Sequence, residues 1–268
     1  KYRHCDPQKV VSKESFLKWI LENISEMIID SHTHLGFEDM YQKQNPRELI
    51  KLMDRAGIDK SVIFPFGPVF SKNQSYQSEN IKISKCSNNP RFITFGRVNQ
   101  LAPDSLEEVE RIKDLDFKGI KIHTDAAPLN TYRDLVKKLN EYCLPIMIHA
   151  GNNENSNVEN LKHLEYEGNI IIGHGGKDNI SKAIELVNSR DNFYIETSLL
   201  SLSRTKRLVR QVKDKSKILF GSDAPYDLPE LEVKKIMHAC DHDRKLVRDI
   251  LGKNLEKILW IQKQNITL

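Results

Sequence analysis

Five of the nine histidines stand at or just after the ends of short apolar runs, where the side chains of a parallel sheet can meet. A buried-looking strand ends with His32 and His34, two positions apart, in "MIIDSHTHLG". His123 closes "GIKIH", His149 closes "PIMIH", and His174 lies in "IIIGHGG". Because alternate residues of a strand share a face, His32 and His34 can point toward one shared ligand.

A carboxylate stands in a similar place, since Asp223 ends the apolar run in "ILFGSDAP". Imidazole nitrogens combined with a carboxylate oxygen suit Zn²⁺ or another first-row divalent ion, such as Mn²⁺, Fe²⁺ or Co²⁺. Two imidazoles from one strand would make half of the coordination shell of such an ion. The pattern therefore predicts a metal centre.

Eight apolar runs of strand character alternate with helical patterns along the chain. One helical pattern, "NPRELIKLMDRAG", has Pro46 in its first turn and Gly57 past its end. The strands are expected at 27–34, 61–66, 92–98, 119–123, 145–149, 170–174, 193–197 and 218–223.

This alternation predicts an α/β protein, a (β/α)8 TIM barrel, although a doubly wound open sheet gives similar local signals. No linker or low-complexity tract divides the chain, so we expect one domain over 1–268, with the barrel at about 27–260. The first ~25 residues, including "SKESFLKWILENI", predict an extra amphipathic N-terminal helix outside the barrel.

Composition limits the partners. Lys and Arg exceed Asp and Glu by only 41 to 37, which is too balanced to imply a nucleic acid. No run of about 20 apolar residues suggests a membrane span. Four cysteines without paired spacing favour free thiols and a cytoplasmic location. A small-molecule substrate is the expected partner, and a homo-oligomer stays open.

Each of these residues has an ordinary structural explanation when taken alone. His149 or His174 could be a hydrogen-bonded histidine near a glycine turn, and Asp223 could cap a helix. The His32-Thr-His34 pattern is short and weak by itself. Their common placement at the ends of strands 1, 5, 6 and 8 favours the metal centre.

The set of motifs resembles the amidohydrolase superfamily of metal-dependent barrel enzymes. In the residues around these motifs, the chain is similar to the amidohydrolase-related branch, which includes the aminocarboxymuconate-semialdehyde decarboxylase-like proteins. The motifs are "IIDSHTHLG", "FKGIKIHTD", "PIMIHAG", "GHGG", "FGSDAP" and "ILGKNLEKIL". The resemblance implies that His32, His34, His149 and Asp223 hold the metal. It makes Asp223 and His174 the catalytic residues, of which Asp223 transfers a proton. His174 would be an acid/base residue, a residue that holds a metal ligand in place, or a ligand of a second ion.

Three further residues are candidates for the site. Lys121 shares a strand face with His123, and the resemblance allows it to be a carboxylated bridge between two ions or an amine that binds an acidic substrate. His123 could orient a ligand or contact the substrate. Arg97, in "TFGRVN", suits a substrate carboxylate or an external salt bridge. Outside this set, Asp30 lies deeper on the first strand and could fix an imidazole or be a buried acid paired elsewhere.

The leading functional interpretation is a metal-dependent hydrolase that acts on a small-molecule amide, ester or lactone through a metal-activated water. The alternative is a metal-dependent decarboxylase or hydratase, a lyase, of a small carboxylated substrate. A TatD-like deoxyribonuclease is disfavoured because its typical acidic residue on strand 4 is replaced here by Lys121 and His123. A barrel that only binds ligands is hard to reconcile with an intact set of ligands.

Overall fold

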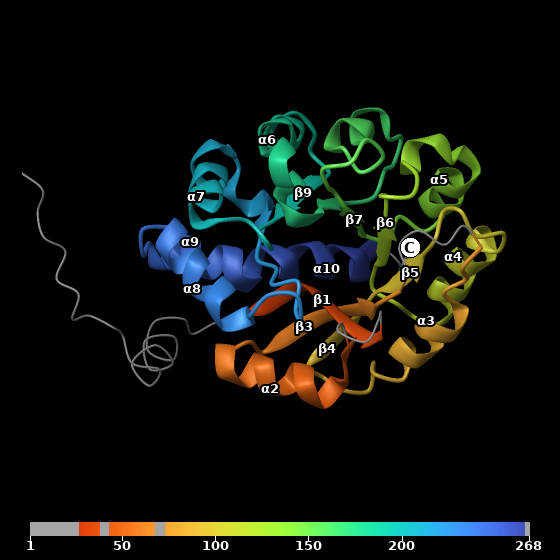
Figure 1. The fold of residues 1–268 in the computed structure, drawn as a ribbon, viewed down its shortest axis with the longest axis horizontal. Helices are drawn as coiled ribbons and strands as arrows, with labels where there is room; N and C mark the ends of the chain where they lie inside the picture. The colour runs from red at the N-terminus through yellow and green to blue at the C-terminus, as the bar shows by residue number, and fades with distance from the viewer. Residues whose placement is uncertain (1–26, 38–42, 68–72, 266–268) are drawn as a thin grey trace, which may run out of the picture.

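Parallel strands arranged side by side form the centre of the molecule in a computed structural model (Figure 1). The structure describes residues 27–37, 43–67 and 73–265, with side chains up to 259. The predicted N-terminal helix lies outside the described residues. The strands are β1 (Ile29–Phe37), β2 (Lys43–Gln44), β3 (Lys60–Pro65), β4 (Phe92–Thr94), β5 (Gly96–Val98), β6 (Ile120–His123), β7 (Ile146–His149), β8 (Ile170–Ile172), β9 (Phe193–Glu196) and β10 (Ile218–Leu219).

Helices follow most of the strands and surround them (Figure 1). The α-helices are α2 (Pro46–Ala56), α3 (Gln77–Ser84), α4 (Ser105–Asp114), α5 (Arg133–Asn140), α6 (Ile180–Ser189), α7 (Leu202–Gln211), α8 (Pro229–Ala239), α9 (Arg244–Arg248) and α10 (Asn254–Asn265). Shorter helical turns are η1 (Leu129–Thr131), η2 (Val158–His163), η3 (Gly173–Asn179), η4 (Lys215–Lys217) and the π-turn η5 (Asp249–Lys253). None of the helices in the described ranges is long and apolar enough to cross a membrane.

The strand order is that of a TIM barrel. The pairings run β1-β3-β4 and β5-β6-β7-β8-β9-β10, all parallel, and β2 adds a short antiparallel hairpin to β1. Phe95 joins β4 to β5, so these two strands together form the third predicted strand. The segment after β10 then pairs with β1, since the Ser31 N–H donates to the Phe220 carbonyl at 2.9 Å and the Asp223 N–H to the His32 carbonyl at 2.8 Å.

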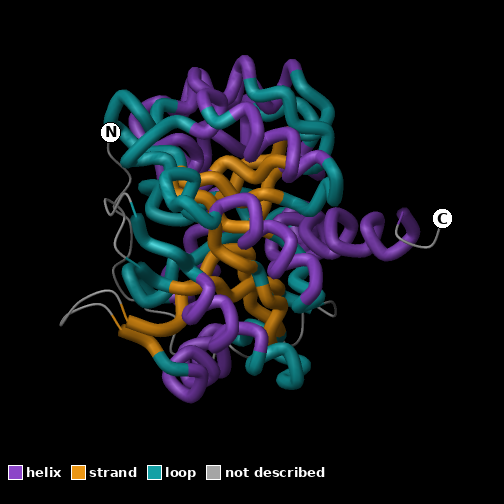
Figure 2. Tube along the Cα trace, turned by 90° about the vertical axis from the view of Figure 1, so that its right-hand side faces the viewer, coloured by secondary structure: helices purple, strands orange, loops and turns teal. Residues whose placement is uncertain are grey.

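Alternation along the strands separates two apolar clusters. Outward residues such as Ile120 and Ile122 pack under the helices, while inward residues such as Val62, Phe64 and Met147 fill the interior. The helix α10 adds Leu255 and Ile258 to the interior cluster, and its C-terminal part extends away from the body (Figure 2). With apolar side chains filling the interior, polar inward residues collect at the carboxyl ends of the strands.

The predicted helix after β1 forms as its sequence suggests. Asn45 and Glu48 make a reciprocal capping box, and Pro46 occupies the first turn of α2. Gly57 ends the helix with φ 70°, a left-handed conformation that costs glycine little. Local signals therefore place α2 correctly between β1 and β3.

Candidate metal centre

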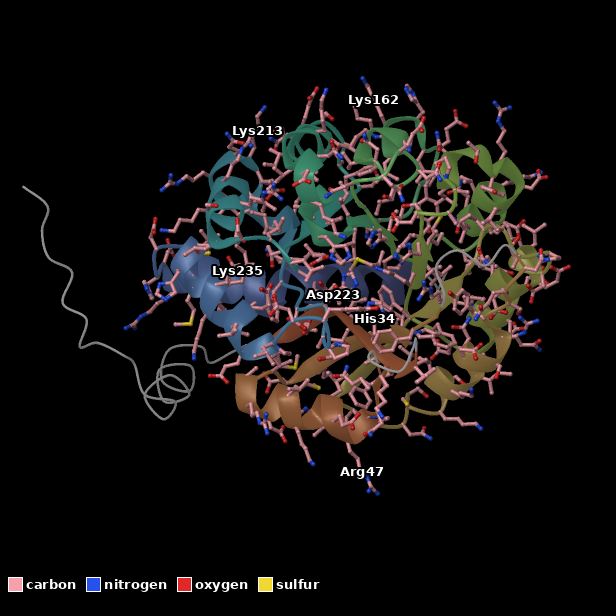
Figure 3. All side chains as sticks on the ribbon, viewed as in Figure 1. His34, Arg47, Lys162, Lys213, Asp223 and Lys235 are labelled. Atoms are coloured by element: carbon pink, nitrogen blue, oxygen red, sulfur yellow. The ribbon has the colours of Figure 1, made fainter. Side chains whose placement is uncertain are left out.

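All of the predicted site residues line one cavity of about 240 Å³ at the carboxyl ends of the strands. Figure 3 shows His34 and Asp223 together near the middle of the molecule, while Lys213 lies on its rim. Two larger cavities, of about 540 and 660 Å³, contain no histidine, so chemistry rather than size marks the site. The cavity is lined by His32, His34, Phe66, Arg97, Lys121, His123, His149, His174, Lys177, Leu199, Asp223 and Tyr226.

A bulge in β1 turns both histidines of the first motif inward. The pairing of β1 with β3 shifts between Asp30 and Thr33, so one extra residue enters β1 there. Asp30 does not contact an imidazole. Its carboxylate accepts the His32 backbone N–H at 3.0 Å and both the N–H and the hydroxyl of Ser222, at 2.9 and 2.5 Å. Asp30 is thus the buried acid paired elsewhere, and it ties β1 to the strand-8 segment.

His32, His34 and Asp223 form a buried triangle. The Nε2 atoms of both histidines lie 3.1 Å from Asp223 Oδ1. Burial lowers the pKa of His34 to about 3. Burial raises the pKa of Asp223, but the charges of His32 and His174 and the hydrogen bonds with His32 and His34 outweigh it and hold that pKa well below its usual range.

The triangle fits a divalent cation. Its three ligand atoms lie within 4.8 Å of one another. Deprotonated imidazole nitrogens and an ionised carboxylate are the donor set that a first-row divalent ion requires. Burial lowers the pKa of His32, but the carboxylates of Asp223 and Glu196 outweigh it and raise that pKa, so an ion would take the place of a proton on His32. His34 Nδ1 is buried and has no hydrogen-bond partner among the described residues, so no contact there holds its ring away from an ion.

Glu196, which the sequence interpretation missed, supports this triangle from behind. It ends β9, has no exposed surface, and its Oε1 lies 3.0 Å from His32 Nδ1. Burial favours its neutral form, but the contacts with His32 and His174 hold the pKa of Glu196 at about 2. The signal was present, because Glu196 ends an apolar run as Asp223 does and shares an inward face with Tyr194.

A second row of histidines borders the triangle. His174 Nε2 lies 3.0 Å from His149 Nδ1, and the His149 ring stacks on His123 with 3.8 Å between centroids. Asp125, also missed in the sequence, lies 3.6 Å from His149 Nε2. The ligand atoms of His149 thus face His174 and Asp125, whereas those of His32 and His34 face Asp223. Ser198 holds His174 from the other side at 2.8 Å.

Three cations share the cavity with these imidazoles. Lys121 is 1 % exposed and its Nζ lies 3.1 Å from His32 Nε2; burial lowers its pKa to about 7. Arg97 is also buried, with Nη1 on the Pro65 carbonyl and the guanidinium 4.7 Å from the Tyr76 ring centroid. Arg97 therefore lies in the cavity wall and not on the outer surface. The third cation is Lys177, at the cavity lining.

Four residues of the cavity lining have strained backbone. His174, Lys177, Leu199 and Asp223 all have positive φ, between 46° and 61°. Such conformations cost about 1–3 kcal/mol each in a residue with a side chain, and surrounding contacts must sustain them. The left-handed turn at His174 and the residues after it also ends the sixth strand at Ile172, two residues earlier than predicted.

The amidohydrolase family model matches residues 29–260. No curated protein matches the sequence. A 5-carboxyvanillate decarboxylase from Sphingomonas paucimobilis is 15% identical, with a TM-score of 0.69 over 88% of this chain and 99% of that one. A dihydroxybenzoic acid decarboxylase from a Polaromonas species, with bound manganese and the inhibitor 2-nitroresorcinol, is 14% identical with a TM-score of 0.70 over 88% and 97%.

A protein described as a probable 2-pyrone-4,6-dicarboxylic acid hydrolase from Acinetobacter baumannii, with citric acid bound, is similar as well. It is 17% identical, with a TM-score of 0.66 over 87% of this chain and 99% of that one. These likenesses confirm the predicted barrel fold. With the family match over most of the described residues, they lead to one conclusion. The chain belongs to the amidohydrolase family.

Proposed function

We propose that this protein is a metal-dependent decarboxylase of a small carboxylated ring compound. The observation that carries the proposal is the position of Arg97, Lys121 and Lys177 in the same cavity as the histidines and Asp223. A divalent ion would add further positive charge, so the cavity favours an anionic substrate. The decarboxylases among the similar structures support a carboxylated one.

The proposed ligands of the ion are His32, His34 and Asp223. His149 would be the fourth once its ring turned from His174 and Asp125 toward the ion. A divalent ion bound there would supply a Lewis acid that stabilises negative charge on substrate oxygens. Zn²⁺ fits the donor set, and the manganese in the Polaromonas decarboxylase makes Mn²⁺ the second candidate.

Decarboxylation breaks the bond between a carbon and its carboxylate, releases CO₂, and leaves an electron pair that takes up a proton. Asp223 and His174 are the residues that we assign to hold and deliver this proton. Arg97 and Lys177 would bind a remaining acidic group of the substrate. Phe66 and Tyr226 contact the His34 ring, with centroids 4.8 and 5.6 Å away, and would form the wall against the substrate ring.

A hydrolase of a small carboxylated lactone or ester is the second candidate, and it was the first interpretation of the sequence. The similar hydrolase from Acinetobacter favours it, because the same cations and the same metal set would serve that reaction. The two functions differ in product, since hydrolysis adds water and retains every carbon atom.

Product analysis distinguishes them. The protein loaded with Zn²⁺ or Mn²⁺ is incubated with dihydroxybenzoic acid, 5-carboxyvanillate and 2-pyrone-4,6-dicarboxylic acid, and CO₂ and product masses are measured. Release of CO₂ from a benzoate by the wild-type protein, but not by Asp223→Asn, supports the decarboxylase. Ring opening without CO₂ would move the assignment to a hydrolase, and metal-loaded protein inactive on all three would refute the substrate class.

A further inference from the structure

The carboxylate of Glu196 has donors on both oxygens, and two of these donors are backbone amides. Oε1 accepts the backbone N–H of His174 and the Ser198 hydroxyl, and Oε2 accepts the Ser198 N–H at 2.6 Å. Backbone amides can only donate, so they favour an ionised carboxylate that acts as an acceptor. His32 Nδ1, 3.0 Å from Oε1, must then be the donor.

This contact determines which nitrogen of His32 is available. A neutral imidazole carries one proton, so a proton on Nδ1 leaves Nε2 with a lone pair. That Nε2 is the atom that faces Asp223 Oδ1 and Lys121 Nζ, both at 3.1 Å. The arrangement supplies a nitrogen ligand on the side of the ring that faces the cavity.

The neighbouring strand is shaped around the same carboxylate. A Cβ at Gly221 would collide with Glu196 Oε2 and would lie 3.1 Å from His32 Cβ. Only glycine allows the segment after β10 to pass this close to both residues. The Glu196 carboxylate is thus surrounded by hydrogen-bond donors, and the missing side chain of Gly221 provides the space that it occupies.

We infer that Glu196 is the positioning residue of the metal centre, fixing His32 with its proton on Nδ1 so that Nε2 faces the ion. The inference rests on the proposed metal ligands but not on the substrate or the reaction. Carboxylates behind metal-binding histidines typically contribute 10–100-fold to metal affinity. Glu196 contacts neither the cavity nor a substrate, so it acts only through His32 and the His174 loop.

Glu196→Gln tests the inference with little change in volume. The amide has one accepting oxygen, so it can keep only one of the two backbone hydrogen bonds. With that oxygen on the Ser198 N–H, its NH₂ takes the place of Oε1 beside the His174 N–H and His32 Nδ1, which moves the imidazole proton to Nε2. We expect the affinity for Zn²⁺, measured against a chromophoric chelator, to fall about 10–100-fold. The matched control is Glu232→Gln, because Glu232 is also buried but lies on α8 beside Lys235.

An affinity of Glu196→Gln within about threefold of the wild type, by the same scale, would overturn the inference. An equal loss in Glu232→Gln would also overturn it, because that would reflect general destabilisation. If Glu196→Gln does not fold, ¹⁵N-histidine NMR of the Zn²⁺-loaded wild-type protein decides the matter. A proton on His32 Nδ1, assigned by its loss in His32→Gln, supports the inference, and a proton on Nε2 contradicts it.

The readout separates this inference from the proposed function. Zn²⁺ affinity is measured without substrate, so inactivity toward benzoates and pyrones leaves the result unchanged. Failure of the wild-type protein to bind Zn²⁺ would instead refute the metal centre itself.

Discussion

Replacing Lys121 by methionine should stabilise the metal-free protein while it disables the site. Lys121 is a buried cation, and burial lowers its pKa from 10.5 to about 7. The unfolded chain therefore holds this proton more tightly than the folded chain does. Each tenfold difference in proton affinity corresponds to about 1.4 kcal/mol, so the buried amine destabilises the fold by up to about 5 kcal/mol below pH 7.

The size of this effect must depend on pH. Below pH 7 both states carry the proton and the full cost applies, whereas between pH 7 and 10.5 only the unfolded chain holds it and the cost fades. Lys121→Met should therefore raise the free energy of unfolding by about 5 kcal/mol at pH 6 and by about 2 kcal/mol at pH 9. Methionine has a similar length and can pack on Phe64, whose ring centroid lies 4.9 Å from Nζ.

Urea denaturation of chelator-treated protein at the two pH values measures both numbers. Lys118→Met is the control, because Lys118 lies three residues earlier, is partly exposed, and should change stability by less than about 0.5 kcal/mol. Unchanged or reduced stability of Lys121→Met at pH 6, or a gain that does not shrink at pH 9, would show that the buried amine of Lys121 does not destabilise the fold through its lowered pKa. The same variant should lose activity, because the buried ammonium that destabilises the fold also lies in the proposed substrate cavity.

Three other perturbations have defined outcomes. Ser222→Ala removes the hydroxyl bonded to Asp30 at 2.5 Å and should lower the free energy of unfolding by about 1–3 kcal/mol, measured by denaturation. Arg97→Met should raise KM for a carboxylated substrate about 10–150-fold, the equivalent of one charged hydrogen bond, with a smaller effect on kcat; an unchanged KM would remove Arg97 from substrate binding. Lys235→Met removes a partly buried ammonium that donates to two backbone carbonyls after β9 at 3.0 and 2.9 Å. It should cost about 2–4 kcal/mol of stability, and a loss under 1 kcal/mol in a melt would contradict that role.

The residues that hold the site were predictable where the strand pattern was strong. The inward face of β6 follows from alternation, which places Lys121 and His123 in the cavity and Ile122 under the helices. The order of the histidines along the chain needs only the parallel barrel to bring them together. These features depend on local periodicity, which sequence records directly.

The contacts that arrange the site were not predictable in the same way. The bulge in β1 depends on the pairing with β3, so alternation alone could not show that Asp30 faces Ser222 instead of an imidazole. Glu196 ends β9, and its partner His32 lies 164 residues away along the chain. Such long-range partners arise from the closed arrangement of strands, and no local pattern specifies them.

Some predicted strand ends were wrong for a related reason. The eighth strand was expected over residues 218–223, but β10 ends at Leu219. The following residues still pair with β1, yet Asp223 adopts φ 61°, which no regular strand allows. A functional residue in a strained conformation breaks the local rule, so the pattern overestimates the regular element there.

Metal analysis of protein purified without added metal or chelator is the most direct test of the proposed metal centre. We expect about one equivalent of a divalent ion in the wild-type protein, as one set of His and Asp ligands can hold. We also expect loss of that ion in both His32→Ala and Asp223→Asn, with folding checked by circular dichroism. A wild-type protein that carries no divalent ion and takes up none on incubation with Zn²⁺ or Mn²⁺ would contradict the proposed metal centre.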